Sequence, residues 1–194
     1  MSSDPQLTPF SYTVLVLVGE RGAGPHDLVQ MMRRGRVYWS SSESQWYAEP
    51  KRLEKLGLLR SRKEPGRTRA RTHYELTDAG RDALRAWAVR PAGFPRIQNE
   101  AIVRVLAADL VGDARALEGL RGMHADLDAI DAALDAGEEE AARLPHRERY
   151  LRLNHRLARR LVDAHREWLA EAERELGGGA APPPEGAAGR RDRR

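Results

Sequence analysis

The sequence predicts a mainly α protein with one small β-hairpin, built from an N-terminal domain that contains the hairpin and a C-terminal domain of helices alone. Amphipathic helical patterns dominate the 194-residue chain. Alternation with a period of two occurs around a single Pro-Gly turn at residues 65–66. The segment RPAGFPR, residues 90–96, separates the two regions and is typical of a linker. We therefore expect domains at residues 7–90 and 96–176.

Three glycine-terminated helices are expected before the hairpin. Each opens on a start signal, either proline or a run of serines, and ends at or just before a glycine; the three lie within residues 8–19, 25–35 and 42–57. Pro50 lies inside the third pattern, where proline removes a hydrogen bond and crowds the carbonyl of residue 46. Two interpretations are open at this point. Either the third helix is kinked at Pro50, or regular helix begins only near Glu49.

Two strands and a fourth helix complete the N-terminal pattern. Residues 58–62 and 71–77 flank the Pro-Gly turn, and Thr77 provides an N-cap for a helix that continues to Trp87. The resulting order is helix, helix, helix, strand, strand, helix. This is the order of a winged helix-turn-helix.

The hairpin carries a row of cations. Arg67, Arg69 and Arg71 occupy every second position, so they share one face if the strand extends that far. Farther along, Tyr74 and Leu76 are expected to point into the core. The sequence therefore predicts a wing whose guanidinium groups contact DNA phosphates or enter the minor groove. An exposed hairpin that is merely polar is the alternative.

The third helix is the candidate for reading DNA bases. Its N-terminal side chains can reach base edges, its free N–H groups favour phosphate, and later residues add a hydroxyl and two charges. The expected contacts are Ser42, Ser44, Gln45, Tyr47, Lys51 and Arg52. Trp46 and Leu53 are expected in the core.

These motifs together resemble the PadR family of transcriptional regulators, over residues 7–90. The shared features are an aromatic pair, two short motifs at the end of the third helix, and a motif that begins the fourth: Trp46-Tyr47, Arg52-Leu53-Glu54, Gly57-Leu58-Leu59 and Tyr74-Glu75-Leu76-Thr77-Asp78-Ala79-Gly80. In the family the proline usually follows the tyrosine directly, whereas here Ala48 and Glu49 intervene. The resemblance implies a dimeric DNA-binding regulator, which we expect to be a repressor. The operator bound by such a dimer is expected to be an inverted repeat.

The C-terminal half contains three apolar stripes at helical spacing. They run through residues 102–110, 117–134 and 150–168, and the last alternates steps of three and four in the manner of a coiled-coil seam. Such stripes must be buried against each other or against a second chain. The resemblance implies a homodimer, and we expect its interface at Leu153, Leu157, Leu161 and Trp168. A monomeric helical hairpin is the alternative.

Small-molecule control is a further implication of the resemblance, because planar aromatic effectors act on members of this family. Tyr150 and Trp168 are the aromatic candidates, on one apolar stripe and five helical turns apart. They can meet only if the two copies of this helix run antiparallel. The competing interpretation makes Trp168 a large core residue.

Charge is distributed unevenly along the chain. Residues 1–93 hold sixteen Arg and Lys against ten Asp and Glu, whereas residues 94–176 hold thirteen against seventeen. This asymmetry indicates a polyanion-binding front half; the alternative is that arginine serves here as a generic solubilising residue. The tail, residues 177–194, is rich in Gly, Ala and Pro and is expected to be disordered.

Other classes of protein find little support. The chain has no cysteine, its six histidines show no metal-binding spacing, and no phosphate-binding glycine loop is present. We expect no enzyme, no cofactor, no metal and no membrane association, and a cytoplasmic location. A winged-helix protein-interaction module and a MarR-like regulator remain as alternatives; the former would be indicated by a neutralised wing and third helix.

Overall fold

The structure is a computed structural model that describes residues 7–34, 38, 41–65, 70–95 and 97–178. Its elements follow in the order α1 (Pro9–Val18), α2 (Pro25–Arg34), α3 (Glu43–Lys55), β1 (Leu59–Glu64), β2 (Arg71–Leu76), α4 (Asp78–Ala88), α5 (Glu100–Leu106), α6 (Ala108–Val111), α7 (Asp113–Leu120), α8 (Gly122–Ala142) and α9 (Glu148–Gly177). The mainly α class with one small hairpin is confirmed. The expected tail lies outside the described residues from position 179 onward.

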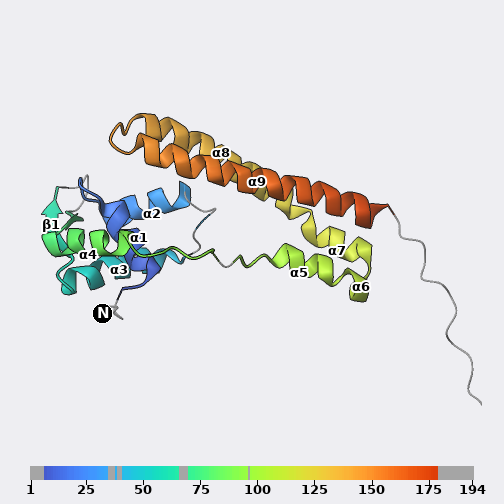
Figure 1. Cartoon of the computed structure of the whole chain (residues 1–194), viewed down its shortest axis with the longest axis horizontal. Coiled ribbons are helices and arrows are strands. Elements are labelled where there is room, and N and C mark those ends of the chain that lie inside the picture. The colour runs from blue at the N-terminus through green and yellow to red at the C-terminus, as the bar shows by residue number, and fades with distance from the viewer. Residues whose placement is uncertain (1–6, 35–37, 39–40, 66–69, 96, 179–194) are drawn as a thin grey trace, which may run out of the picture.

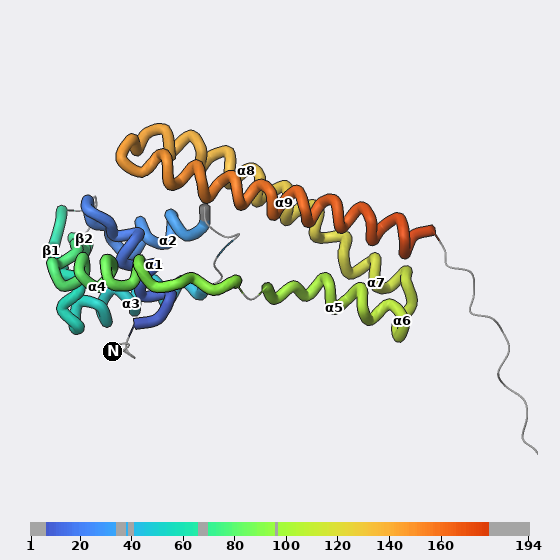
Figure 2. Tube along the Cα trace, in the orientation of Figure 1, coloured from blue at the N-terminus to red at the C-terminus, as the bar shows by residue number. Residues whose placement is uncertain are grey.

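The elements divide between two hydrophobic cores (Figure 1). The N-terminal core is formed by α1–α4 with the hairpin, and the C-terminal core by the helices after the linker. Figure 2 shows the linker passing between the two parts while the long α8–α9 hairpin extends back over α2. The turn between α8 and α9 therefore lies on the N-terminal domain, and the far end of α9 points away from it.

Helix α1 is the apolar centre of the N-terminal core. Thr8 caps it in a reciprocal capping box with Ser11, and Pro9 occupies the first turn, where its missing N–H costs nothing. Val14 and Leu15 are fully buried. The helix ends at Gly19, whose φ of 55° is accessible to glycine and strained for other residues.

The hairpin joins this core along β2. Its register pairs Leu59 with Leu76 and Ser61 with Tyr74, which places these four side chains on the inner face. Tyr74 and Leu76 are buried, as the alternation predicted. Tyr74 also exchanges backbone hydrogen bonds with Ala23, so the loop before α2 covers the free edge of β2.

The C-terminal core is closed by the antiparallel packing of α8 on α9. Leu127 and Leu134 of α8 meet Val162 and Leu169 of α9. Acidic residues of α8 recur every three or four positions beside this core, and two arginines of α9 bind them: Arg159 pairs with Asp131, Asp135 and Glu138, and Arg166 pairs with Asp128 and Asp131.

Two expectations need correction. The stripe at 117–134 does not lie on a single helix, because the chain is divided at Arg121 into α7 and α8. The first strand extends to Glu64 rather than ending at Arg62, because cross-strand pairing continues to Arg71.

Gly80 permits the close approach of α4 to the chain segment that precedes β1. It is buried in the first turn of α4, beneath the Thr77 cap, and a Cβ at this position would overlap the carbonyl oxygen of Leu58. That oxygen already accepts the N–H of Thr77. The glycine of the Tyr74–Gly80 motif is therefore required by packing.

We expect Gly80→Ala to lower the free energy of unfolding by about 1–3 kcal/mol, the usual cost of overpacking a close contact. The matched control is Gly93→Ala in the linker, where no atom lies near the added methyl group, so the change should stay within about 0.5 kcal/mol. Urea denaturation of both variants measures the difference. Equal stabilities of the two variants would contradict this account of Gly80.

Candidate nucleic-acid interface

Helix α3 has one buried side and one open side. Trp46, Pro50 and Leu53 recur at helical spacing and are buried in the N-terminal core. The Trp46 indole N–H donates to Ser41 Oγ at 2.6 Å, and its ring meets Phe10 edge to face, with centroids 4.7 Å apart. This packing fixes the rotation of α3 about its own axis, and therefore which residues face solvent.

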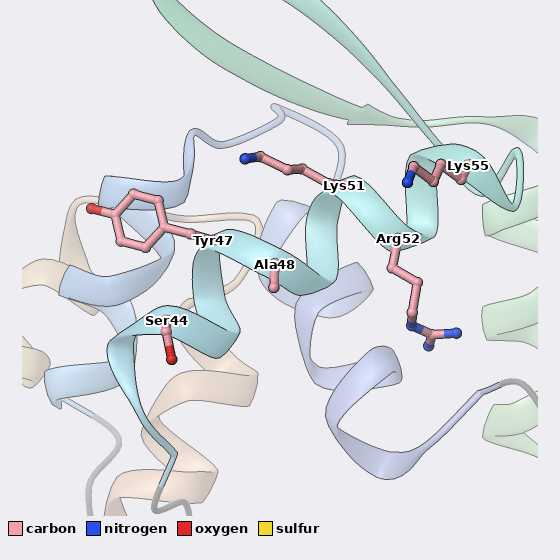
Figure 3. A pocket seen from close by; sticks show the side chains of 6 residues that line it. All are labelled: Ser44, Tyr47, Ala48, Lys51, Arg52 and Lys55. Carbon is pink, nitrogen blue, oxygen red and sulfur yellow. The ribbon is translucent and has the colours of Figure 1, made fainter.

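The open side is a polar and basic stripe, shown in Figure 3. It borders a shallow depression of about 480 Å³ that is lined by Ser44, Tyr47, Ala48, Lys51, Arg52 and Lys55. Hydroxyl groups occupy the N-terminal half of the stripe, and ammonium groups the C-terminal half. Such a surface can donate hydrogen bonds to base edges at one end and neutralise phosphates at the other.

The structure brings the expected residues Ser44, Tyr47 and Lys51 together on this stripe and adds Lys55 to them. Lys55 had a signal in the sequence, because it follows Lys51 by four residues and therefore shares its face. Gln45 is exposed beside the stripe.

The beginning of α3 has backbone donors that no cap side chain satisfies. Ser42 is the N-cap in extended conformation, but its hydroxyl group lies 2.9 Å from Ser44 Oγ and makes no cap hydrogen bond. Free N–H groups at a helix start attract anions. Glu43 opposes this attraction in the first turn, although its carboxylate pairs with Arg33 of α2 at 2.5 Å.

Arg52 differs from the other residues expected to contact DNA, because it bonds within the domain. Its guanidinium group donates to both carboxylate oxygens of Glu49 and, at 2.9 Å, to the hydroxyl group of fully buried Ser11 in α1. Burial alone would raise the pKa of Glu49, but hydrogen bonds from Arg52 and Ser11 hold it below its usual value. In Figure 3 the Arg52 side chain points away from Lys51. Arg52 thus ties α3 to α1.

Helix α3 continues through Pro50 without interruption. It begins at Glu43, so the interpretation in which regular helix starts near Glu49 is wrong. The proline leaves the carbonyl of residue 46 without its helical N–H partner. Because its ring is buried, packing against the core offsets part of that cost.

The outer face of the hairpin holds carboxylates among its arginines. Glu75 pairs with Arg60 and Arg62, and Glu64 pairs with Arg62 and with Arg71 at 3.3 Å. Hydrogen bonds from Arg62 and Arg60 lower the pKa of Glu75. The spacing of the three wing arginines did not reveal these acids, since they are brought in by strand register. Arg67 and Arg69 lie outside the described residues.

Comparison with known proteins finds a family that resembles the N-terminal domain. Residues 14–86 match the model of the Transcriptional regulator PadR-like family. The N-terminal domain is therefore similar to the PadR-like family. No protein with a curated description matches the chain.

Solved structures extend the likeness beyond this PadR-like domain. Bacillus subtilis PadR in complex with operator DNA is 20% identical, with a TM-score of 0.70 over 90% of this chain and 99% of that one. The Vibrio cholerae virulence activator AphA is 24% identical, with a TM-score of 0.59 over 87% and 98%. Bacillus subtilis PadR in complex with p-coumaric acid is 19% identical, with a TM-score of 0.57 over 84% and 98%. At these identities the likeness establishes the shared fold.

The C-terminal domain leaves Leu153 and Leu157 of the expected dimer seam uncovered. Leu153 and Leu157 are 58% and 51% exposed, whereas Ala158 and Val162, on another side of α9, pack against α8. Leu161 is half-buried. The first half of the predicted interface, at Leu153 and Leu157, is therefore separate from the surface that closes the hairpin, whereas Trp168 packs against the core.

The two aromatic candidates for effector binding differ in environment. Trp168 packs against the C-terminal core, whereas Tyr150 is 64% exposed near the start of α9. The structure does not bring them together within one chain.

The described part of the chain contains no cluster of three or more His, Cys, Asp or Glu that could hold a metal ion. Among those same residues, no helix has the length and apolar character needed to cross a bilayer.

Proposed function

We propose that this PadR-like protein is a dimeric, sequence-specific DNA-binding transcriptional regulator, with α3 in the major groove and the β1–β2 wing beside it. The observation that carries the proposal is the exposed stripe of α3, where Ser44, Tyr47 and Lys51 lie on the side opposite Trp46. Within the described residues, neither Lys51 nor Lys55 has an ion-pair partner, so both charges are available for phosphates. Operator DNA in the complex of the structural relative from Bacillus subtilis supports the same use of this fold.

A protein-interaction module is the alternative function. It would be favoured by a neutralised wing and a neutralised α3, and Glu64 and Glu75 do neutralise part of the wing stem. The basic stripe of α3 argues for DNA instead. The matched family is described as one of transcriptional regulators, and we predict that the chain has no catalytic activity.

Repression is the direction of control we propose for this regulator, as the family resemblance implies. The relative AphA is an activator, so the fold is compatible with either direction. A reporter gene under the selected operator would distinguish them, since repression requires that deletion of the regulator raise expression.

Base and phosphate contacts should separate in binding experiments. We expect Lys51→Ala, and likewise Arg67→Ala, Arg69→Ala and Arg71→Ala, to weaken binding to all duplexes similarly, each lowering the salt slope by about one where a phosphate contact is lost. Gln45→Ala, Ser42→Ala or Ser44→Ala should instead relax base preference, by about 1–3 kcal/mol for each base that the side chain reads. Selection from a random duplex pool, followed by titration at several salt concentrations, measures both.

Arg115→Ala is the matched control for charge, because this arginine lies in α7 of the C-terminal domain and its side chain bonds Val111 within the same domain. An unchanged salt slope in the combined Lys51 and wing variant would contradict the proposed interface.

The dimer is proposed to form along α9. Besides Leu153 and Leu157, the free side of α9 carries three arginines in its first half, and four acids with one arginine in its second half. Within the described residues none of these eight has an ion-pair partner: Arg149, Arg156, Arg160, Asp163, Glu167, Glu171, Arg174 and Glu175. In an antiparallel pair each basic half faces an acidic half, whereas a parallel pair would oppose like charges.

We expect Leu157→Asp to give monomers with weakened operator affinity, because the substitution places a charge in the seam. Val89→Asp is the control, since that exposed residue is the C-cap of α4 and lies outside α9. Light scattering reports the mass of each.

Arg156→Glu should also weaken the dimer, and adding Glu167→Arg in the same chain should restore it if the helices are antiparallel. A wild-type protein that stays monomeric at micromolar concentration would exclude this interface.

Control by a planar aromatic effector completes the proposal. The relative from Bacillus subtilis binds p-coumaric acid, and in an antiparallel dimer Trp168 of one chain approaches Tyr150 of the other. We expect p-coumaric acid or a related flat acid to quench tryptophan fluorescence and lower operator affinity, and Trp168→Phe to lose both effects while still dimerising. If a panel of such compounds changes neither fluorescence nor operator affinity, Trp168 is a core residue only. Its packing against the C-terminal core is consistent with that role.

A further inference from the structure

The linker does not determine how the two domains are oriented. Its described residues are exposed from Val89 to Pro95, and Phe94 is 88% exposed. Figure 1 shows it as an extended segment between the domains. The angle between the domains must therefore be set by other contacts. These contacts lie where the α8–α9 turn meets the N-terminal domain.

Arg147 makes one of these contacts, from the N-cap position of α9. Its Nη2 donates to the carbonyl oxygen of Val16 at 3.2 Å. Val16 lies in the last turn of α1, where carbonyl groups lack helical partners and carry partial negative charge. Helix α1 has no basic residue in its own last turn. The cation that this helix end favours is thus provided by the other domain, from a residue 131 positions farther along the chain.

Gly19 leaves room for this contact. Arg147 Nη1 would be only 3.4 Å from a Cβ at Gly19, and the positive φ of that glycine disfavours any side chain there. The residue that ends α1 therefore also keeps the approach to its carbonyls open.

Tyr38 makes a second contact with α9. Its hydroxyl group donates to the carbonyl oxygen of Asn154 at 2.5 Å. Tyr38 lies in the sequence between α2 and α3, the proposed DNA-reading helix. Residues 147 and 154 are two turns apart on one side of α9, about 10 Å along its axis. Two contacts at this distance prevent the N-terminal domain from rotating about either contact alone.

We propose that Arg147 and Tyr38 are positioning residues that fix the angle between the N-terminal domain and the dimerising helices, and thereby the distance between the two copies of α3. This inference rests on the proposed dimeric, DNA-binding function. The spacing of operator half-sites mirrors the separation of the reading helices in a dimer. These two residues then set the accepted spacing of half-sites, while α3 sets the base sequence within each half-site.

The test uses the full-length protein and a duplex library in which two selected half-sites are separated by spacers of varied length. The wild type should prefer one spacing. Arg147→Ala and Tyr38→Phe should flatten that preference. Affinity for the preferred spacing should fall roughly two- to fivefold for Arg147→Ala, the range expected for losing an exposed cation at a helix end, and roughly two- to tenfold for Tyr38→Phe, the range expected for losing one hydrogen bond. Base preference within the half-site, and affinity for a single half-site, should stay unchanged. Arg147→Lys, which keeps the cation, should recover part of the preference.

Arg143→Ala is the matched control, because that arginine lies in the same turn but pairs with Glu140 of its own helical hairpin. Tyr38→Phe removes a single oxygen atom, and the thermal unfolding of each variant verifies that it is folded. The inference is overturned if both variants keep the wild-type spacing profile, or if base preference changes together with spacing. If the wild type selects a half-site without any spacing preference, the inference fails while DNA binding stands. If the wild type selects no duplex at all, the proposed function itself fails.

Discussion

The burial of one side of α3 is the constraint on which the candidate interface depends. Trp46, Pro50 and Leu53 enter the core together, and the helical period then directs Tyr47 and Lys51 to solvent. The rotation is held at two further points, by the indole N–H of Trp46 on Ser41 and by Arg52 on Ser11. Because Ser11 is fully buried, losing Arg52 would leave a polar group without this partner in the core. A helix held so firmly presents a rigid surface, which sequence reading requires.

Helix α9 is under a second constraint, because it must pack against α8 and, in the proposed dimer, against a second chain. The arginines on the side facing α8, Arg159 and Arg166, are satisfied by the acidic positions of that helix. On the opposite side, the leucines remain exposed and the flanking charges have no ion-pair partners among the described residues. Packing within the chain thus buries one side of α9. The other side remains an amphipathic surface whose basic and acidic halves are complementary. Such an exposed apolar surface beside a closed hairpin indicates an interface rather than a deficient core.

Much of the fold was predictable because its signals are local. Thr8 with Pro9, Gly19, and Thr77 mark helix ends through caps and punctuation, and Tyr74 and Leu76 reveal the inner face of a strand by alternation. Several contacts that the sequence did not predict join distant residues. Ser11 and Arg52 are 41 positions apart, and Val16 and Arg147 are 131 apart. Neither pair leaves a local pattern, and the acids opposite the wing arginines follow from strand register alone.

Those acids change how the charge of the N-terminal domain should be understood. Counted by sequence, the wing is a source of strong attraction for any polyanion. In the structure, Glu64 and Glu75 compensate most of the charge of Arg60, Arg62 and Arg71 on the hairpin stem. Exposed ion pairs of this kind add little stability, but they reduce the number of counterions that the stem can displace from DNA. Among the described residues, Lys51 and Lys55 on the open stripe of α3 keep charges without an ion-pair partner, next to the groups proposed to read bases. Under the proposed function, this arrangement weakens binding to random DNA more than binding to a matched site, since only the matched site would also engage the hydroxyl and amide groups of α3.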